Sequence, residues 1–334
     1  MATARPPERL DNIQGLRAVA AMLVVVLHCY GLGTKSGHDM TFLAGADPWG
    51  NAGVDLFFVI SGFIMVHINR DRAMSGWRFL GNRLLRIAPL YWFVTGLFAL
   101  SIARGIMAPV DAGPGQPWTS LLFLSQPLSG ADPLLYVGWT LEYEMFFYLC
   151  FAASMAIARK TGVDLMVPLF AFVIGAIVLL GVGLVAVEFL FGALLARLLP
   201  GAGSARWAGL GLLLGGAALL ALSYGDAAAY ALRVLYYGVP AAMIVAGAVL
   251  LPQRAGALAS ALGDASYSLY LIHLFALAFM FALLPTDNGW ASLAMAIGAA
   301  QLYAVGVHRY IERPLNGIAR IAGNRMTVLG RATA

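Results

Sequence analysis

Two ionisable side chains interrupt the apolar stretch LRAVAAMLVVVLHCY, which runs from Leu16 to Tyr30. Arg17 and His28 are eleven residues apart, so in an α-helix they lie within about 20° of one face and about 16 Å apart along the axis. A histidine can serve as a general base near neutral pH, and an arginine can bind an anionic group. The spacing therefore predicts a helix that carries a reacting group and an anion-binding group on one face.

Six further ionisable side chains lie in apolar segments, where an ionisable group is costly and is therefore a functional candidate. They are Asp55, His67, Glu142, Glu144, Glu188 and His273. His28, Asp55 and the two neighbouring glutamates fall in the outer halves of their segments, which favours a shared site at that depth. Glu142 and Glu144 are about 200° apart on a helix, so only one can readily face the same cavity as His28. The competing interpretation of each residue is a structural pair inside a helix bundle.

Polar stripes are expected on the helices that carry Asp55 and His273. Asp55, Gly62 and Asn69 follow one another at intervals of seven residues, and the glycine would permit close approach of another backbone. Ser266, Tyr270 and His273 follow an i, i+4, i+7 pattern in GDASYSLYLIHLF and form a second stripe. Hydrogen bonding between helices explains Ser266 and Tyr270 as well as a functional role does.

Several arginines crowd the segment NRDRAMSGWRFLGNRLLRIAPLY. They are Arg70, Arg72, Arg78, Arg83 and Arg86. An excess of arginine on the cytoplasmic side of a membrane protein explains some of them. Arg83 and Arg86 are also spaced i, i+3 on one helix face, and guanidinium groups bind phosphate bidentately. The segment therefore predicts a phosphate-bearing cytoplasmic ligand, whereas no cysteine or histidine pair has the spacing that predicts a metal site.

The composition indicates which elements must position these groups. The chain has 334 residues, of which 61% are hydrophobic and 11% are charged. Soluble globular chains are about 45–50% apolar and about 25% charged, so this composition is typical of an integral membrane protein. The net charge of +5 comes from basic residues at helix ends and not from one patch, so nucleic acid is not an expected partner. Cys29 and Cys150 lie in apolar segments, which argues against a disulfide framework.

Ten segments are apolar and long enough to cross a bilayer, which takes about 20 residues. They are residues 13–33, 52–69, 87–107, 135–158, 163–181, 183–199, 207–223, 230–251, 263–284 and 290–311. With the N-terminus inside, all but Lys35, Arg104 and Arg233 of the 21 lysines and arginines fall on the cytoplasmic side or its border. The sequence thus predicts a single all-α transmembrane domain over residues 1–334, a bundle of about ten helices with both termini cytoplasmic.

Four stretches carry a family resemblance. They are LRAVAAMLVVVLH with its Arg–ten residues–His spacing, GVDLFFVISGFIM followed by Arg-x-x-Arg in RLLRIAPLYW, GWTLEYEMFFYL, and the pair SYSLYLIHLF and YIERPL. Together they span residues 14 to 315 and resemble the acyltransferase-3 family of membrane acyltransferases. The family glutamate falls on Glu144, whereas Glu142 stands where many relatives have a small or amide residue, so its role stays open. The form of the third stretch is most similar to the branch that modifies exopolysaccharides.

The resemblance implies transfer of an acyl group, usually acetyl, from cytoplasmic acyl-CoA to a hydroxyl of an extracytoplasmic or lipid-linked glycan in a bacterial inner membrane. We expect the acyl-CoA to be bound by Arg17, Arg78, Arg83, Arg86, Tyr270 and His273. His28 would then be the general base, with Glu144 or Asp55 as the orienting acid and no metal. An acyl-histidine intermediate is the alternative route.

Other functions stay open at this level. A transporter or flippase with a proton-relay histidine would explain the ionisable groups inside the apolar segments but not the arginine-rich segment. Acylation of a small metabolite or a lipid is a third interpretation. The expected partners are acyl-CoA, a glycan or lipid-linked oligosaccharide and membrane lipids, and a homo-oligomer is also open.

Overall fold

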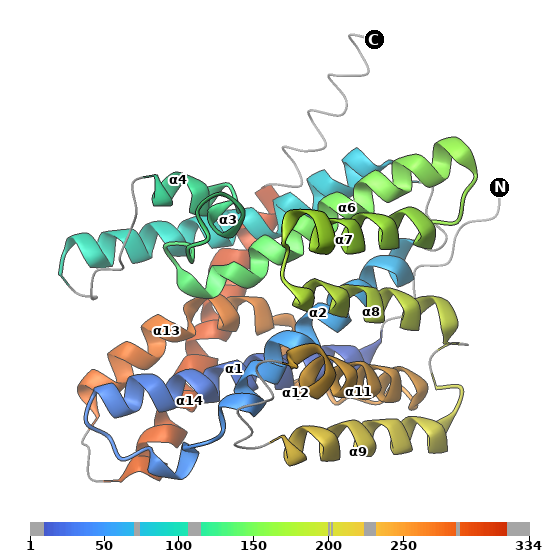
Figure 1. Ribbon diagram of the computed structural model, residues 1–334. Coiled ribbons are helices and arrows are strands. Elements are labelled where there is room, and N and C mark those ends of the chain that lie inside the picture. Colours follow the sequence, from blue (N-terminus) through green and yellow to red (C-terminus); the bar gives the residue numbers. More distant parts are fainter. Residues whose placement is uncertain are drawn as a thin grey trace. The chain divides into compact units, whose positions relative to one another are not determined.

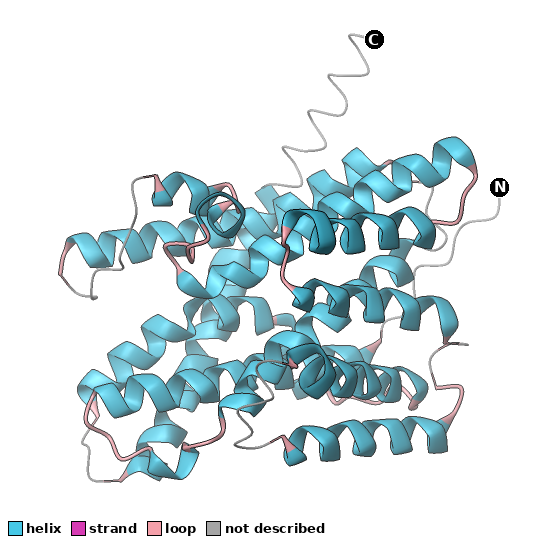
Figure 2. Ribbon diagram, in the orientation of Figure 1, coloured by secondary structure: helices cyan, strands magenta, loops and turns pink. Residues whose placement is uncertain are grey.

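The computed structural model describes residues 10–69, 74–105, 115–199, 201, 203–223, 232–284 and 288–318, and these residues form helices without any β-strand (Figures 1 and 2). The chain separates into two compact units that alternate along the sequence. The first unit comprises residues 1–73 and 183–305, and the second comprises residues 74–182 and 306–334. This alternation means that each unit is built from segments far apart in the chain.

The first unit contains most of the helices. They are α1 (Asp11–Lys35), α2 (Asp47–Asn69), α8 (Val187–Leu198), α9 (Arg206–Leu222), the π-helix η4 (Val234–Gly238), α11 (Val239–Leu250), α12 (Ala257–Asp264), α13 (Ser266–Leu283) and most of α14 (Gly289–Val307). Two short 3-10 turns, Thr41–Leu43 and Leu184–Ala186, also belong to it. α1 packs on α2, α12 and α13, while α2 also packs on α8, and α9 packs on α11.

Glycines bring α2 and α8 into backbone contact. A Cβ on Gly62 would lie 2.0 Å from the carbonyl oxygen of Phe189, and a Cβ on Gly192 would lie 1.9 Å from that of Val59. No larger residue fits at such distances, and small residues are the usual means by which membrane helices approach closely. The close approach expected at Gly62 is therefore confirmed. Asp55 lies two turns before Gly62 on the same face of α2, so it also points toward this interface.

The second unit contains the arginine-rich helix. Its elements are α3 (Gly76–Ala103), α4 (Gln116–Leu121), α5 (Ser125–Ser129), the turn Tyr136–Gly138, α6 (Trp139–Thr161), α7 (Met166–Leu180) and the π-helix η5 (His308–Glu312). α6 packs on both α3 and α7. Ser75 caps α3 by accepting a hydrogen bond from the backbone N–H of Arg78, 3.4 Å away, which starts the helix well before the expected residue 87. Arg78, Arg83 and Arg86 consequently all lie on α3, whereas Arg70 and Arg72 lie outside the described residues.

Six helical segments are long and apolar enough to cross a membrane. They are Asp11–Lys35, Trp49–Asn69, Gly76–Ala103, Tyr136–Thr161, Ser266–Leu283 and Gly289–Ile318. Each other expected segment also coincides with a helix, but these helices are shorter. α8, for example, has 12 residues, about 18 Å, against a hydrocarbon core of about 30 Å. The ten-span count and the cytoplasmic termini therefore stay predictions.

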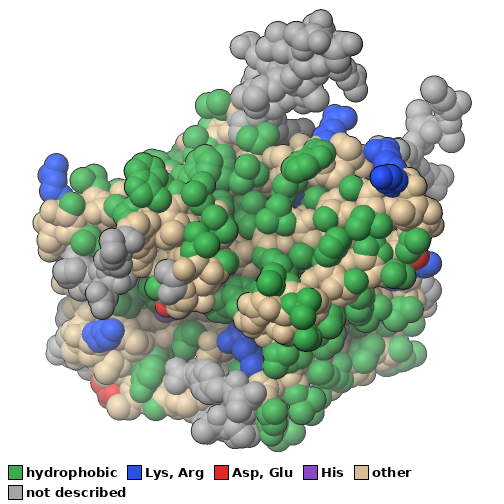
Figure 3. Space-filling view, turned by 45° about the horizontal axis from the view of Figure 1, so that its top comes forward, with side chains coloured by type: hydrophobic (Ala, Val, Ile, Leu, Met, Phe, Trp, Pro, Cys, Tyr) green, Lys and Arg blue, Asp and Glu red, His purple; other side chains and the backbone are tan. Residues whose placement is uncertain are grey.

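The surface agrees with a membrane location. Hydrophobic side chains cover much of the face shown in Figure 3. Several large apolar side chains are strongly exposed, among them Leu179, Leu222 and Leu302. Soluble proteins rarely expose so much contiguous apolar surface. Together with the six long apolar helices, this surface indicates a multi-pass membrane protein.

Candidate functional site

A pair of histidines lies between α1 and α13 in the first unit. Nε2 of His273 lies 3.0 Å from Nδ1 of His28, and the ring centroids are 4.8 Å apart. His273 is fully buried, and His28 is half-buried. The sequence predicted both residues as site residues but did not predict that they contact each other. α1 and α13 bring them together because the two helices pack directly on one another.

Hydrogen-bond partners select one tautomer for each neutral ring. Nδ1 of His273 lies 2.8 Å from the carbonyl oxygen of Tyr270 and 3.2 Å from that of Leu269. Because a carbonyl oxygen only accepts, Nδ1 of His273 carries the proton and its Nε2 is the acceptor. Nδ1 of His28 faces this acceptor and also the carbonyl oxygen of Val24, 2.9 Å away, so it carries a proton as well. The lone pair of neutral His28 is therefore on Nε2, the nitrogen that can take a proton from a substrate.

Tyr270 contributes to this arrangement through its backbone. Its carbonyl oxygen orients His273, while its ring packs edge-on against Phe57 of α2 with the centroids 5.9 Å apart. The side chain of Tyr270 is buried. α1 and α13 thus carry the histidine pair, and Phe57 of α2 packs against the neighbouring Tyr270 ring.

Asp55 and Phe57 lie on different faces of α2. Residues 55 and 57 are about 200° apart on a helix, and Phe57 faces α13, so Asp55 points away from the histidine pair. Its two oxygens accept hydrogen bonds from Arg233, from Nε at 3.1 Å and from Nη2 at 2.7 Å. These hydrogen bonds to Asp55 come from Arg233 and not from His28. A catalytic role for Asp55 stays a prediction. Arg233 was not predicted as its partner, because 178 residues separate the two in the chain.

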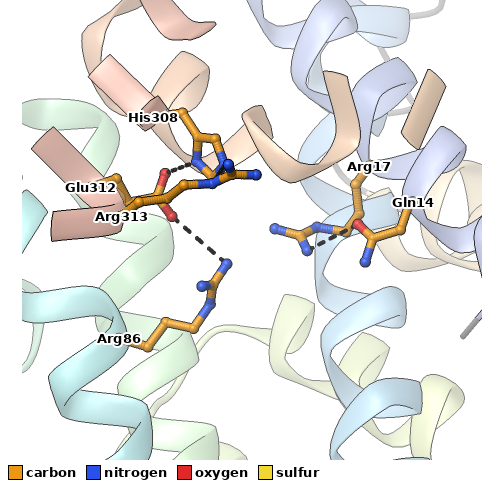
Figure 4. Close-up of polar contacts among 6 residues, drawn as sticks. All are labelled: Gln14, Arg17, Arg86, His308, Glu312 and Arg313. Carbon is orange, nitrogen blue, oxygen red and sulfur yellow. Dashed lines mark hydrogen bonds and ion pairs between the residues drawn. The ribbon is translucent and has the colours of Figure 1, made fainter. Parts of the chain in front are cut away.

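Arg17 lies on α1, the continuous helix that also carries His28. Both side chains are half-buried, and the unbroken helix places them on one face as the spacing predicted. Nη1 of Arg17 donates to Oε1 of Gln14 at 3.4 Å (Figure 4). An anionic partner was expected for Arg17, and this hydrogen bond goes to a neutral amide of the same helix.

A second cluster lies in the second unit around Glu312 of the YIERPL stretch. Glu312 is fully buried, and its Oε1 forms a 3.8 Å ion pair with Nη2 of Arg86 (Figure 4). Its Oε2 lies 2.7 Å from Nδ1 of His308, and Nε of Arg313 donates to Nε2 of His308 at 3.0 Å. A carboxylate accepts at Nδ1 and a guanidinium donates at Nε2, so His308 is the neutral Nδ1–H tautomer. This cluster was not predicted from the sequence, although the i, i+4 spacing of His308 and Glu312 places both side chains on one helix face.

The other two arginines predicted to bind phosphate also lie in the first turns of α3. Arg83 is half-buried, and its guanidinium carbon lies 5.6 Å from the ring centre of Phe79, in a cation–π arrangement. Arg78 is exposed. Arg78, Arg83 and Arg86 therefore lie on one helical segment, and their phosphate-binding role stays a prediction.

The two glutamates of α6 have different environments. Glu142 is buried, and its oxygens accept the backbone N–H groups of Ser125 at 2.9 Å and Gln126 at 2.8 Å, which start α5. Glu144 is half-buried and accepts a hydrogen bond from the hydroxyl of Tyr148, one turn later on α6. Glu142 thus holds a connecting segment in place. Glu144 is the glutamate of this pair that stays a candidate for chemistry.

Comparisons with known proteins agree with the sequence motifs. A model of a family described as an acyltransferase domain matches residues 10–307. The exopolysaccharide production protein ExoZ of Rhizobium meliloti (strain 1021) is 34% identical over 89% of this chain and 97% of its own length. The acyltransferase MdmB of Streptomyces mycarofaciens is 27% identical over 97% of this chain and 95% of its own. No solved structure matches the chain significantly. Since the family match and the similarity to ExoZ both extend over nearly the whole chain, this protein belongs to the acyltransferase-3 family.

Proposed function

We propose that the protein is a membrane O-acyltransferase that moves an acyl group, acetyl in the simplest case, from cytoplasmic acyl-CoA to a hydroxyl of an extracytoplasmic or lipid-linked polysaccharide. Family membership supports acyl transfer, and the name of ExoZ, a protein of exopolysaccharide production, supports a polysaccharide acceptor. The observation that carries the proposal is the hydrogen-bonded pair of His28 and His273. This pair provides a histidine whose proton-accepting nitrogen is defined by its surroundings.

The reaction follows from that tautomer. Nε2 of His28 takes the proton of the acceptor hydroxyl while its Nδ1–H stays bonded to Val24 and His273. The hydroxyl oxygen attacks the thioester carbon, the carbon–sulfur bond breaks, and the proton passes from His28 to the departing sulfur, so that CoA leaves as a thiol. During the reaction His28 is positively charged, and its hydrogen bond to the neutral acceptor nitrogen of His273 becomes charge-assisted and stronger. His273 is therefore a positioning residue.

The same lone pair also suits a covalent route. Nε2 of His28 could attack the thioester itself and form an acyl-histidine before the acceptor arrives. The two routes differ in what happens without an acceptor, because only the covalent route leaves labelled acyl groups on the protein. Acid-quenched mass spectrometry of protein incubated with acyl-CoA alone separates them.

The CoA phosphates would bind to the arginines of α3. Arg86 contacts Glu312 at 3.8 Å, which is longer than a hydrogen bond, and its side chain is 42% exposed. Its guanidinium can therefore turn toward a phosphate without leaving Glu312 alone, because His308 stays bonded to that carboxylate. Arg17 would contact the ligand closer to the thioester, as its place on the His28 face of α1 suggests.

The test uses purified full-length protein in detergent with acyl-labelled acetyl-CoA. We expect release of CoA and transfer of label to the polysaccharide fraction of the producing cells, and loss of both in His28→Ala. A transporter or flippase would show neither activity in the unaltered protein. Mass spectrometry of surface glycans from cells with and without the gene then identifies the acceptor. If the glycans are unchanged and a small metabolite or a lipid is modified instead, that molecule is the acceptor and the polysaccharide is not.

A further inference from the structure

A buried charge cluster in the first unit lies apart from the histidine pair. It consists of Asp55 on α2, Glu188 on α8 and Arg233 immediately before η4. Both carboxyl groups are fully buried, and the side chain of Arg233 is 21% exposed. Because Asp55 faces away from Phe57 and α13, the cluster is separate from the histidine pair. If both acids were ionised, the cluster would carry two negative charges and one positive charge.

Arg233 neutralises one of the two acids. Its Nε and Nη2 donate to the two oxygens of Asp55 at 3.1 and 2.7 Å, which is the bidentate geometry of a strong guanidinium–carboxylate pair. Nη2 also reaches the backbone carbonyl oxygen of Asn51 at 3.4 Å. The guanidinium is 6.0 Å from the ring centre of Tyr237. Asp55 is therefore the ionised carboxylate of the cluster.

Glu188 has the opposite environment. Neither of its carboxyl oxygens accepts a hydrogen bond from any residue that the structure describes. Its charged neighbours are the Asp55 carboxylate and the Arg233 guanidinium, and Arg233 directs Nε and Nη2 to Asp55. A Cβ on Gly238 would lie 2.9 Å from Oε1 of Glu188. An ionised Glu188 would be a buried charge without donors, next to a second negative charge, and this is strongly unfavourable. A protonated Glu188 removes that charge and provides the O–H donor that a contact between two carboxyl groups requires.

We propose that this cluster is a proton-binding site in which Glu188 holds one proton and donates it to Asp55. The cluster is then neutral, with Asp55 negative, Arg233 positive and Glu188 uncharged. The shared proton ties α8 to α2, and the guanidinium ties α2 to the segment before η4. Gly192 lies one turn after Glu188, and Gly62 lies two turns after Asp55, so the tight glycine contacts hold the two carboxyl groups together.

Infrared spectroscopy of the purified full-length protein tests this directly, because a protonated carboxyl and a carboxylate absorb at separate frequencies. We expect the spectrum of the unaltered protein minus that of Glu188→Gln, at neutral pH, to show the loss of one carboxylic-acid band. The matched control is Glu142→Gln, which removes a buried glutamate that accepts two backbone N–H groups and should therefore lose a carboxylate band. Loss of a carboxylate band in Glu188→Gln would overturn the proposal.

Thermal unfolding gives a second readout. The glutamine of Glu188→Gln is neutral, has the shape of the protonated acid and can donate to Asp55, so the melting temperature should stay within a few degrees of the unaltered protein. Asp55→Asn removes the ionised partner of Arg233 and should lower the melting temperature much more. A Glu188→Gln variant that unfolds or aggregates would contradict the proposal. Such a result would mean that the fold requires the negative charge of an ionised Glu188, which glutamine cannot supply. Neither readout depends on the acyl transfer reaction.

Discussion

Nδ1 of His28 and Nε2 of His273 lie 3.0 Å apart, although the two residues are 245 positions apart in the chain. The contact joins the first transmembrane helix to the SYSLYLIHLF helix near the C-terminal end. It also explains why a neutral, fully buried histidine stands where an acid was expected to orient the general base. A neutral acceptor holds the reactive tautomer of His28 without adding a second charge to an apolar interior.

His28→Ala should lower the rate of acyl transfer by a factor of about 10² or more, as for the loss of a general base. Affinity for acyl-CoA should stay nearly unchanged because the histidine meets only the thioester end. The measurements are the transfer rate and CoA affinity by calorimetry on one sample with an unaltered size-exclusion profile. His38→Ala is the matched control, since His38 binds Ser292 and the Phe281 carbonyl. A folded His28→Ala protein with near-normal turnover would remove His28 from the reaction.

His273→Gln should retain much more activity than His273→Leu, because an amide oxygen can replace the acceptor nitrogen whereas a leucine cannot. The effect should be on kcat, with KM for acyl-CoA almost constant. Nitrogen NMR of histidine-labelled protein, assigned with His28→Gln, should show His28 as the Nδ1–H tautomer and a mixture in His273→Leu. A rise in KM with constant kcat would return His273 to the acyl-CoA-binding role that the sequence suggested.

Replacing Arg83 and Arg86 with alanine should raise KM for acetyl-CoA while the protein still inserts. Each lost charge-assisted contact is worth about 1.5–3 kcal/mol, or about a tenfold to hundredfold change. Lysine should rescue only partly because it lacks the planar fork of donors. Arg159→Ala, at an exposed position near the end of α6, is the control and should leave KM unaltered. If CoA affinity is unchanged in the double variant, the phosphates bind elsewhere.

Glu144→Gln should reduce turnover far more than Glu142→Gln. Glu142→Ala should instead reduce stability, because it leaves the N–H groups of Ser125 and Gln126 without an acceptor, at about 1–3 kcal/mol each. Turnover and melting temperature measured on all three variants check both statements. If Glu142→Gln loses activity without losing stability, Glu142 is the glutamate that takes part in the reaction, and its assignment as structural is wrong.

Cysteine labelling tests the predicted orientation of the second unit. Leu128 on α5 is exposed and should lie outside, whereas Lys160 at the end of α6 is exposed and should lie in the cytoplasm. Leu128→Cys should react with an impermeant thiol reagent in intact cells, and Lys160→Cys only after permeabilisation. The natural Cys29 and Cys150 are buried and should stay unlabelled. The reverse pattern would place the arginines of α3 on the side of the membrane opposite to the cytoplasmic acyl-CoA.

Features that depend on local helix geometry were predictable from the residues and their spacing. The shared face of Arg17 and His28 and the divergence of Glu142 and Glu144 follow from 3.6 residues per turn. The close approach at Gly62 follows from the absence of a side chain. The family motifs also determined the acyltransferase assignment, because they are read residue by residue. These features need no knowledge of which helices are neighbours.

Which side chains contact one another became known from the packing of the helices. His28 bonds to His273, Asp55 to Arg233, and Arg86 to Glu312, each on a different helix. Periodicity identifies the face of a helix but not the helix that covers it, because that choice depends on side-chain shapes and glycine contacts summed over the whole interface. Helix geometry alone shows that Glu142 and Glu144 point in different directions. The contacts show which of the two is structural, because Glu142 accepts the backbone N–H groups of Ser125 and Gln126.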